Sequence, residues 1–96
     1  MGYQVIFAPE AERDLNEIIA YIAQANPEAA LKFAARLAAQ ARSLSELPHR
    51  GASVPRRPGT RKLVHGQYLI YYQIRETERT VEVLRFWHGA RRRPKL

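Results

Sequence analysis

The spacing of apolar residues changes once along this 96-residue chain, and that change restricts the possible fold more than any other feature. Up to residue 46, apolar side chains recur at intervals of three and four, which is the spacing of one helix face. From residue 61 onward, β-branched and aromatic residues form short runs between turn residues, which is typical of strands. Residues 48–60 hold three prolines and two glycines, so we expect a loop there.

Helix start signals occur twice in the first half of the chain. Pro9 follows a short run of β-branched and aromatic residues, and proline is tolerated at the first position of a helix. Asn26 and Pro27 repeat the signal, because a capping side chain stands before a first-position proline. Since so few residues separate the two segments, the helices should form an antiparallel hairpin. The predicted elements are a strand over residues 3–8 and helices over residues 9–24 and 27–46.

The second half of the chain alternates between strands and turns. Gly66-Gln67 has the form of a two-residue hairpin turn with glycine at its first central position. The last strand has apolar residues on both faces, which is typical of a central strand covered on both sides. Those residues are Val81, Val83, Leu84 and Phe86. The predicted strands are residues 61–65, 68–74 and 80–87.

The order of these elements predicts the fold class. A strand, two helices and three strands favour a single α+β domain over residues 1–96. We expect an N-terminal strand, an antiparallel helix hairpin and a three-strand antiparallel meander, with the hairpin on one face of a mainly antiparallel sheet. The other face of the sheet would then carry the basic residues of the second half.

Charge is distributed unevenly along the chain. Residues 1–48 hold four basic and six acidic side chains, a balance of −2, whereas residues 49–96 hold twelve basic and three acidic ones, a balance of +9. This asymmetry indicates an acidic partner for the second half: nucleic acid, an acidic protein segment, or both. A basic face that serves only solubility is the alternative, although a mixture of both signs serves that purpose better.

Several classes of protein are excluded by what the sequence lacks. There is no cysteine, which rules out disulfides and cysteine-ligated metals, and the spacing of the three histidines matches no zinc pattern. The N-terminal residues do not form a signal peptide, and no apolar run is long enough to cross a bilayer. We expect a soluble cytoplasmic protein without a metal, a cofactor or a membrane partner.

Four segments carry a family resemblance. They are Phe7-Ala-Pro-Glu-Ala11 with Asp14, Ile18 and Tyr21-Ile22; Leu47-Pro-His-Arg-Gly51; Arg61-Lys-Leu63 with Gly66-Gln-Tyr-Leu-Ile-Tyr-Tyr72; and Val81-Glu-Val-Leu-Arg-Phe-Trp-His-Gly-Ala-Arg91. In this order, and in a chain this short, they resemble the ParE branch of the ParE/RelE toxin superfamily. Ala8 departs from the pattern, which has serine before Pro-Glu-Ala, and the change removes a helix-capping hydroxyl.

The resemblance implies the toxin of a type II toxin–antitoxin system. ParE-type toxins poison DNA gyrase, whereas RelE-type toxins share the fold and cleave mRNA on the ribosome. The implied partners are a cognate antitoxin and gyrase, alone or with DNA; the alternative target is the ribosome with its mRNA. We expect the antitoxin segment to be acidic, to oppose the +9 half, and to fold on binding. A non-toxic relative that serves as a binding module or co-repressor is a third hypothesis.

Arg61, Arg85 and His88 are the catalytic candidates if the chain is a metal-independent endoribonuclease. That reaction needs a base, an acid and positive charge at the phosphate. By the resemblance, the two arginines match phosphate-holding positions, and a histidine titrates near neutrality. The C-terminal tail has no tyrosine, so the set is incomplete and a gyrase toxin without catalysis is favoured. The alternative for each residue is structural: arginines bonded across the sheet, and a histidine bonded to nearby backbone.

A second set of residues is predicted to contact partners. The tyrosines are expected to be half-buried strand residues in the antitoxin contact, with base stacking as the alternative. The arginine run either touches DNA in the gyrase complex, pairs with antitoxin acids or extends into solvent. The tryptophan is expected in the core, although tryptophan is also a favoured interface anchor. The set is Tyr68, Tyr71, Tyr72, Arg85, Trp87, Arg91, Arg92 and Arg93.

Overall fold

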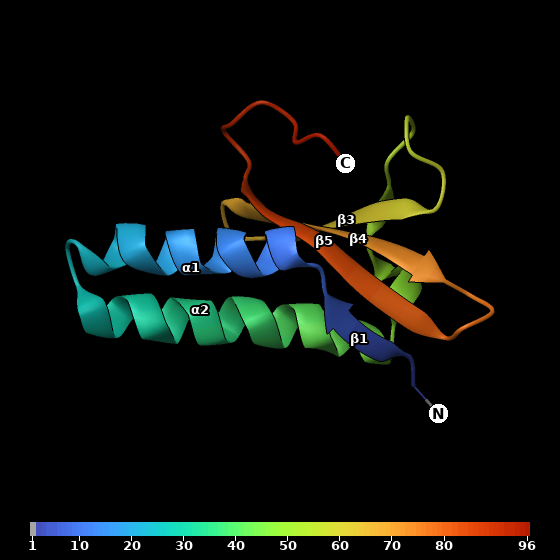
Figure 1. The fold of residues 1–96 in the computed structure, drawn as a ribbon, viewed down its shortest axis with the longest axis horizontal. Helices are drawn as coiled ribbons and strands as arrows, with labels where there is room; N and C mark the ends of the chain where they lie inside the picture. The colour runs from blue at the N-terminus through green and yellow to red at the C-terminus, as the bar shows by residue number, and fades with distance from the viewer. Residues whose placement is uncertain (1) are drawn as a thin grey trace.

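The computed structural model describes residues 2–96 and confirms the α+β architecture (Figure 1). Two antiparallel helices lie side by side and cover one face of a single sheet, while the C-terminal tail passes over the other side (Figure 1). The elements are β1 (Gln4–Phe7), α1 (Pro9–Ala23), α2 (Pro27–Arg42), β2 (Ala52–Ser53), β3 (Thr60–His65), β4 (Tyr68–Arg75) and β5 (Thr80–His88).

The sheet has five strands in the order β1-β5-β4-β3-β2. The predicted meander is β3-β4-β5, in which neighbouring strands are antiparallel. β1 pairs with β5 in parallel, from Gln4 opposite Thr80 to Phe7 opposite Val83. Parallel neighbours require a long connection, and here the helix hairpin and the meander supply it. The last strand therefore lies between two others, as its apolar residues predicted.

Two of the predicted boundaries are wrong. The second helix was expected to reach residue 46, but α2 ends at Arg42 and a 3₁₀ turn covers Ser43–Ser45. The Ser43 hydroxyl donates to the carbonyl of Gln40 at 2.6 Å, and such side-chain bonds compete with a continuing helix. The loop over residues 48–60 also contains regular structure, namely a 3₁₀ turn over Pro48–Arg50 and the short strand β2.

The main core fills the space between the helix hairpin and the sheet. Alanine on the facing sides of α1 and α2 lets the two helices approach closely. A smaller cluster of Leu44, Tyr72 and Val81 extends the core past the end of α2. The buried members of the main cluster are Ala11, Ile18, Leu37, Ala41, Ile70, Val83 and Phe86.

Candidate functional site

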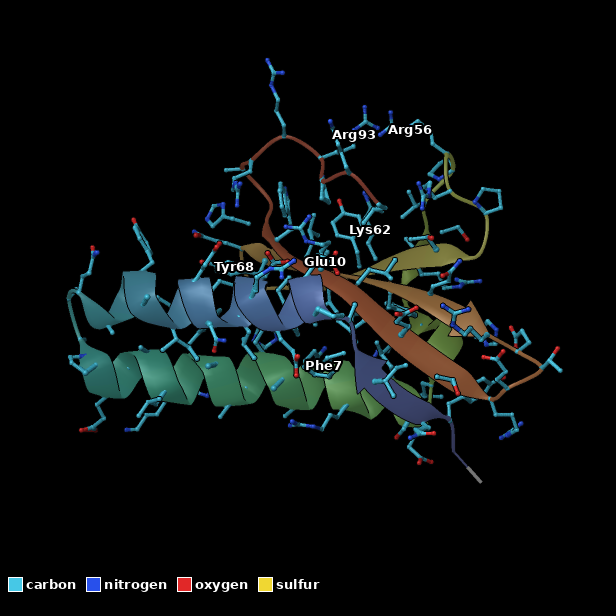
Figure 2. All side chains as sticks on the ribbon, viewed as in Figure 1. Phe7, Glu10, Arg56, Lys62, Tyr68 and Arg93 are labelled. Atoms are coloured by element: carbon cyan, nitrogen blue, oxygen red, sulfur yellow. The ribbon has the colours of Figure 1, made fainter. Side chains whose placement is uncertain are left out.

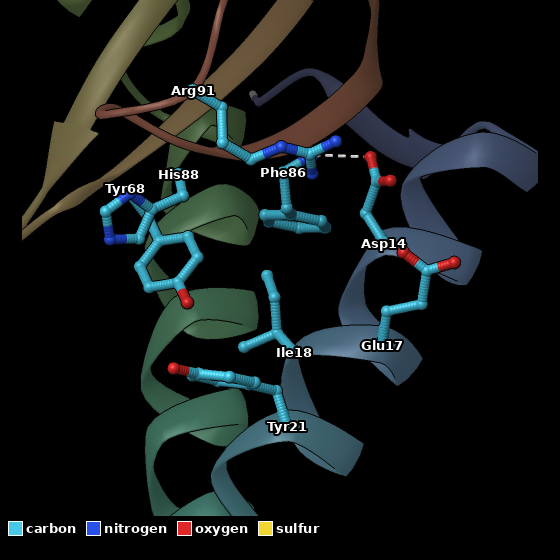
Figure 3. Close-up of a pocket in the computed structure, with 8 residues that line it drawn as sticks. All are labelled: Asp14, Glu17, Ile18, Tyr21, Tyr68, Phe86, His88 and Arg91. Atoms are coloured by element: carbon cyan, nitrogen blue, oxygen red, sulfur yellow. Dashed lines mark hydrogen bonds between the residues drawn. The ribbon is translucent and has the colours of Figure 1, made fainter.

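A cluster of hydrogen-bonded polar groups joins α1 to β5. β1 ends at Phe7, opposite Val83, so the later residues of β5 have no strand on that side. Asp14 of α1 supplies the acceptor that a neighbouring strand would supply, because the Oδ2 of Asp14 accepts from the Phe86 N–H at 3.1 Å (dashed in Figure 3). The same carboxylate accepts from Arg85 Nε at 2.7 Å and Nη2 at 2.9 Å. A nearly buried carboxylate with three donors fixes the helix to the sheet.

The guanidinium of Arg85 is held by its ion pair with Asp14. The hydrogen bond that Arg85 donates to Asp14 raises the pKa of Arg85, and the guanidinium carbon lies 4.7 Å from the centre of the Trp87 ring. Arg91 approaches the same ring at 4.1 Å, and Trp87 Nε1 donates to the carbonyl of Arg92 at 2.6 Å. Trp87 is 9% exposed. It therefore lies in the core, as expected, and anchors the start of the C-terminal tail.

Arg61 is bonded to backbone rather than free for a phosphate. Its Nη1 donates to the carbonyl of Gly51 at 2.7 Å and to that of His49 at 3.2 Å. The Tyr72 hydroxyl donates to the carbonyl of Pro48 at 2.6 Å and accepts from the Gly51 N–H at 2.9 Å. Burial raises the pKa of Tyr72, whose side chain is fully buried. Tyr72 thus contacts the loop from within and presents no surface to a partner.

His88 has bonds at both ring nitrogens. Its Nδ1 accepts from the Ala90 N–H at 3.1 Å, and its Nε2 lies 3.3 Å from Gln67 Oε1. This pattern fits a neutral ring with its proton on Nε2. Tyr68 stacks edge-on against the ring with 5.1 Å between the centroids. These contacts agree with the structural alternative for His88, a histidine that is bonded to nearby backbone.

The three ribonuclease candidates do not converge. Arg61 lies opposite Tyr72, and Arg85 lies opposite Tyr71. Because Tyr71 and Tyr72 are consecutive in one strand, their side chains point to opposite faces of the sheet. The two arginines therefore leave the sheet on opposite sides, whereas His88 lies at the end of β5 opposite Tyr68.

A first hollow of about 370 Å³ opens between α1 and the ends of β4 and β5 (Figure 3). Ile18 and Phe86 form its apolar part, and Tyr21 and Tyr68 flank it. Burial raises the pKa of Tyr68. The rim of the hollow carries charges of both signs, with Asp14 and Glu17 on the helix and Arg91 on the tail. Tyr21 is 72% exposed, so this hollow has an aromatic ring exposed at its edge.

A second hollow, of about 680 Å³, lies on the sheet face opposite the helices. The buried ring of Tyr71 contributes to its lining. Every charged side chain lining it is basic, and these come from the β2–β3 loop, from β3 and from the tail (Figure 2). They are Arg56, Arg57, Lys62, Arg93 and Lys95. We call this hollow the basic pocket.

The predicted contact residues are thus divided between separate surfaces. Tyr68 and Arg91 line the first hollow, whereas Tyr71 and Arg93 line the basic pocket. The exposed Arg92 uses its carbonyl to hold Trp87. Within residues 2–96, no three histidine, cysteine or acidic side chains gather as a metal site. In the same range, no helix has the length and apolar character needed to cross a membrane.

Sequence reasoning missed Asp14 and most of the basic pocket. Asp14 lies three residues after Ala11 and four before Ile18, and is therefore on the buried stripe of α1. A carboxylate on such a stripe needs a buried partner, and this signal was available. Lys62 follows Arg61 in β3, so strand alternation places it on the opposite face. The contribution of the β2–β3 loop could not be anticipated from spacing.

Glu76 connects three segments that are distant in sequence. Its Oε1 accepts from the Tyr3 hydroxyl at 2.6 Å, and its Oε2 lies 2.7 Å from His49 Nε2. The hydrogen bond from Tyr3, followed by that from His49, lowers the pKa of Glu76 below its usual 4.5. The same contact with Glu76 raises the pKa of Tyr3. The N-terminus, the 3₁₀ turn over Pro48–Arg50 and the β4–β5 turn are held together at this carboxylate.

Acid should weaken this connection. Because the folded pKa of Glu76 is depressed, the stability that the ionised carboxylate contributes is complete above pH 4.5 and is lost as pH falls through the folded value. We expect Glu76→Gln to reduce the fall in urea midpoint that the parent shows below pH 4.5. Glu78→Gln, on the same turn, is the matched control. Equal pH dependence in the parent and Glu76→Gln would contradict this expectation.

Comparison with known proteins agrees with the fold and the sequence pattern. The family model described as "ParE toxin of type II toxin-antitoxin system, parDE" matches residues 5–93. Toxin RelE1 of Caulobacter vibrioides is 36% identical, over 97% of this chain and 100% of its own length. A toxin–antitoxin complex of Mycobacterium tuberculosis, RelBE2, aligns with a TM-score of 0.72 and 30% identity over 95% of each chain.

A second solved structure supports the fold alone. The chromosomal ParDE toxin–antitoxin system from P. aeruginosa aligns with a TM-score of 0.75 at 23% identity, over 90% of this chain and 95% of that one. The family match spans nearly all the described elements, from β1 to the tail. The chain therefore belongs to the ParE toxin family, within the ParE/RelE superfamily of type II toxin–antitoxin toxins.

Proposed function

We propose that this toxin acts on DNA gyrase by binding, without a catalytic step of its own. The observation that supports the proposal is the separation of Arg61, Arg85 and His88. The two arginines lie on opposite faces of the sheet and are bonded to backbone or to Asp14. Metal-independent RNA cleavage requires acid, base and positive charge around one phosphate, and these three residues do not surround one.

The proposed neutralising partner is a cognate antitoxin with an acidic segment that folds on binding. The chain carries a net charge of +7, which is the sum of +9 in residues 49–96 and −2 in residues 1–48, so an acidic segment would be attracted along the sheet and tail. The first hollow supplies the apolar part of the contact through Ile18, Tyr21, Tyr68 and Phe86. The P. aeruginosa and M. tuberculosis relatives are described as toxin–antitoxin systems, which supports the same kind of partner here.

The test is a gyrase cleavage assay with purified toxin, supercoiled plasmid and ATP, scored as linear DNA after protein digestion. We expect linear DNA only when gyrase is present, and we expect antitoxin to abolish it. A reaction without gyrase controls for contaminating nuclease. If the toxin kills cells yet yields no linear DNA in this assay, gyrase is not its target.

A second function is favoured by two specific observations. The relative from Caulobacter vibrioides is named Toxin RelE1, and the basic pocket brings Lys62 next to the ring of Tyr71. Lysine and tyrosine can act in proton transfer, so a ribosome-dependent endoribonuclease is the alternative. Primer extension on mRNA from translating ribosomes, with and without toxin, separates the two functions. Toxin-dependent cuts within codons would favour the ribonuclease.

A further inference from the structure

The ring of His88 is bonded to the turn that leads from β5 into the C-terminal tail. Its Nδ1 lies 3.1 Å from the backbone nitrogen of Ala90. Because a backbone N–H can only donate, Nδ1 carries a lone pair and no proton. Two bonds between backbone groups close the same turn. Gly89 donates to the carbonyl of Gln67 at 2.8 Å, and Arg91 donates to that of His88 at 3.0 Å. Of these three bonds, the one from Ala90 alone depends on the ionisation of a side chain.

Protonation of the ring would break the bond from Ala90. A cationic imidazole carries a proton on each nitrogen, so both nitrogens are donors. The new N–H at Nδ1 would face the Ala90 N–H, which would lose its acceptor. Nε2, 3.3 Å from Gln67 Oε1, is already the donor in the neutral ring, so that contact is kept. The loss therefore falls on the side of the ring that faces the tail.

The bond from Ala90 lies next to the contacts that hold the tail on Trp87. The guanidinium carbon of Arg91 lies 4.1 Å from the centre of the Trp87 ring, and Trp87 Nε1 donates to the carbonyl of Arg92 at 2.6 Å. Ala90 directly precedes Arg91, so a change in the backbone at Ala90 moves both contacts. The ionisation of His88 is therefore coupled to the attachment of the tail.

The charges around His88 act in the same direction. The titratable groups that face it are Asp14, Glu17 and Tyr21 of α1, His65 of β3, Tyr68 of β4 and Arg91 of the tail (Figure 3). Asp14 is already paired with Arg85, which leaves Glu17 as the carboxylate that attracts a cationic ring across the first hollow. Arg91 repels such a ring. Both forces draw the cationic ring toward α1 and away from the tail.

We propose that His88 is a pH-sensitive switch that controls the attachment of the C-terminal tail. The neutral ring holds the turn at Ala90 and keeps the tail on Trp87. The protonated ring releases the turn and loosens Arg91 and Arg92 from the indole. Histidine is the side chain that titrates between about pH 5 and pH 8, so mild acid operates the switch. Such a switch acts on the tail of the free toxin, whichever target the toxin has.

An NMR titration of the isotope-labelled toxin from about pH 8 to about pH 5 tests the switch. At the high end, the nitrogen shifts of the His88 ring should show a proton on Nε2 and none on Nδ1. As the ring titrates, the signals of the Ala90 amide and the Trp87 indole N–H should move with the same midpoint. Trp87 is the only tryptophan, so its indole signal is unambiguous. Protection of the Ala90 amide against hydrogen exchange, corrected for the intrinsic rate, should fall about fivefold, the effect of one hydrogen bond.

Two variants identify the histidine responsible. His88→Phe keeps an aromatic ring but removes the acceptor, so the Ala90 and Trp87 signals should stay near their acid positions at every pH. His65→Phe is the matched control, because His65 contacts Phe33 in the same row of aromatic rings and its loss should leave both shifts intact. Thermal melting shows whether each variant is folded.

The titration of the parent decides by itself if His88→Phe does not fold. A proton found on Nδ1 at the high end of the titration would overturn the inference. Signals of Ala90 and Trp87 that do not follow the His88 ring, or that move equally in His88→Phe, would do the same.

Discussion

Asp14→Ala is expected to destabilise the fold by about 3 kcal/mol, the lower end of the cost of breaking a buried ion pair. The substitution leaves the guanidinium of Arg85 without its carboxylate and the Phe86 N–H without its acceptor. No strand can replace that acceptor, because β1 ends opposite Val83. Urea unfolding followed by the fluorescence of Trp87, the only tryptophan, measures the loss directly.

The controls separate burial from charge. Glu17→Ala removes an exposed carboxylate from the same helix and should change stability by less than about 0.5 kcal/mol. Asp14→Asn keeps an acceptor for the Phe86 N–H, so its loss of stability should lie between those of Asp14→Ala and Glu17→Ala. If Asp14→Ala is as stable as the parent, Arg85 does not depend on this pair, and its availability for a phosphate has to be reconsidered.

The arrangement of helices and strands follows from the spacing of apolar residues. Alanine and leucine repeat on one face of α2, and a capping asparagine starts it: Asn26 Oδ1 accepts from the Ala29 N–H at 3.0 Å. Such signals act over three or four residues and are therefore visible in a sequence. The two boundary errors lie where serine and proline determine the backbone locally. These places are the end of α2 and the segment of residues 48–60.

The placement of site residues depended on register, which the sequence does not display. The pairing of Tyr71 with Arg85 is followed by that of Tyr72 with Val83, so Leu84 is an extra residue in β5. This bulge brings Val81, Val83 and Phe86 to the core side, although simple alternation would separate Phe86 from the valines. The sequence predicted that this strand is apolar because it is covered on both faces. The bulge is a second reason for the apolar run, and no glycine in the sequence marks the position of the bulge.

Gly51→Ala is expected to destabilise the fold by about 2 kcal/mol, within the range for overpacking a tight contact. A Cβ at this position would lie 2.6 Å from the carbonyl oxygen of Lys62 and 2.7 Å from the Tyr72 hydroxyl. The backbone conformation of Gly51 is extended, so the requirement for glycine comes from space and not from its dihedral angles. Accommodating the methyl group moves the Tyr72 hydroxyl away from Pro48 and the Gly51 N–H.

Two further variants test this explanation by urea unfolding. Ser53→Ala, on the exposed strand β2, should leave stability within about 0.5 kcal/mol of the parent. Tyr72→Phe should cost about 2 kcal/mol, because two buried backbone groups lose their partner. The double variant of Gly51→Ala and Tyr72→Phe should then cost less than the sum, since Phe removes one of the two clashes. Fully additive losses would show that the methyl group is resisted by the backbone of β3 alone, and that the Tyr72 hydroxyl does not hold the loop against it.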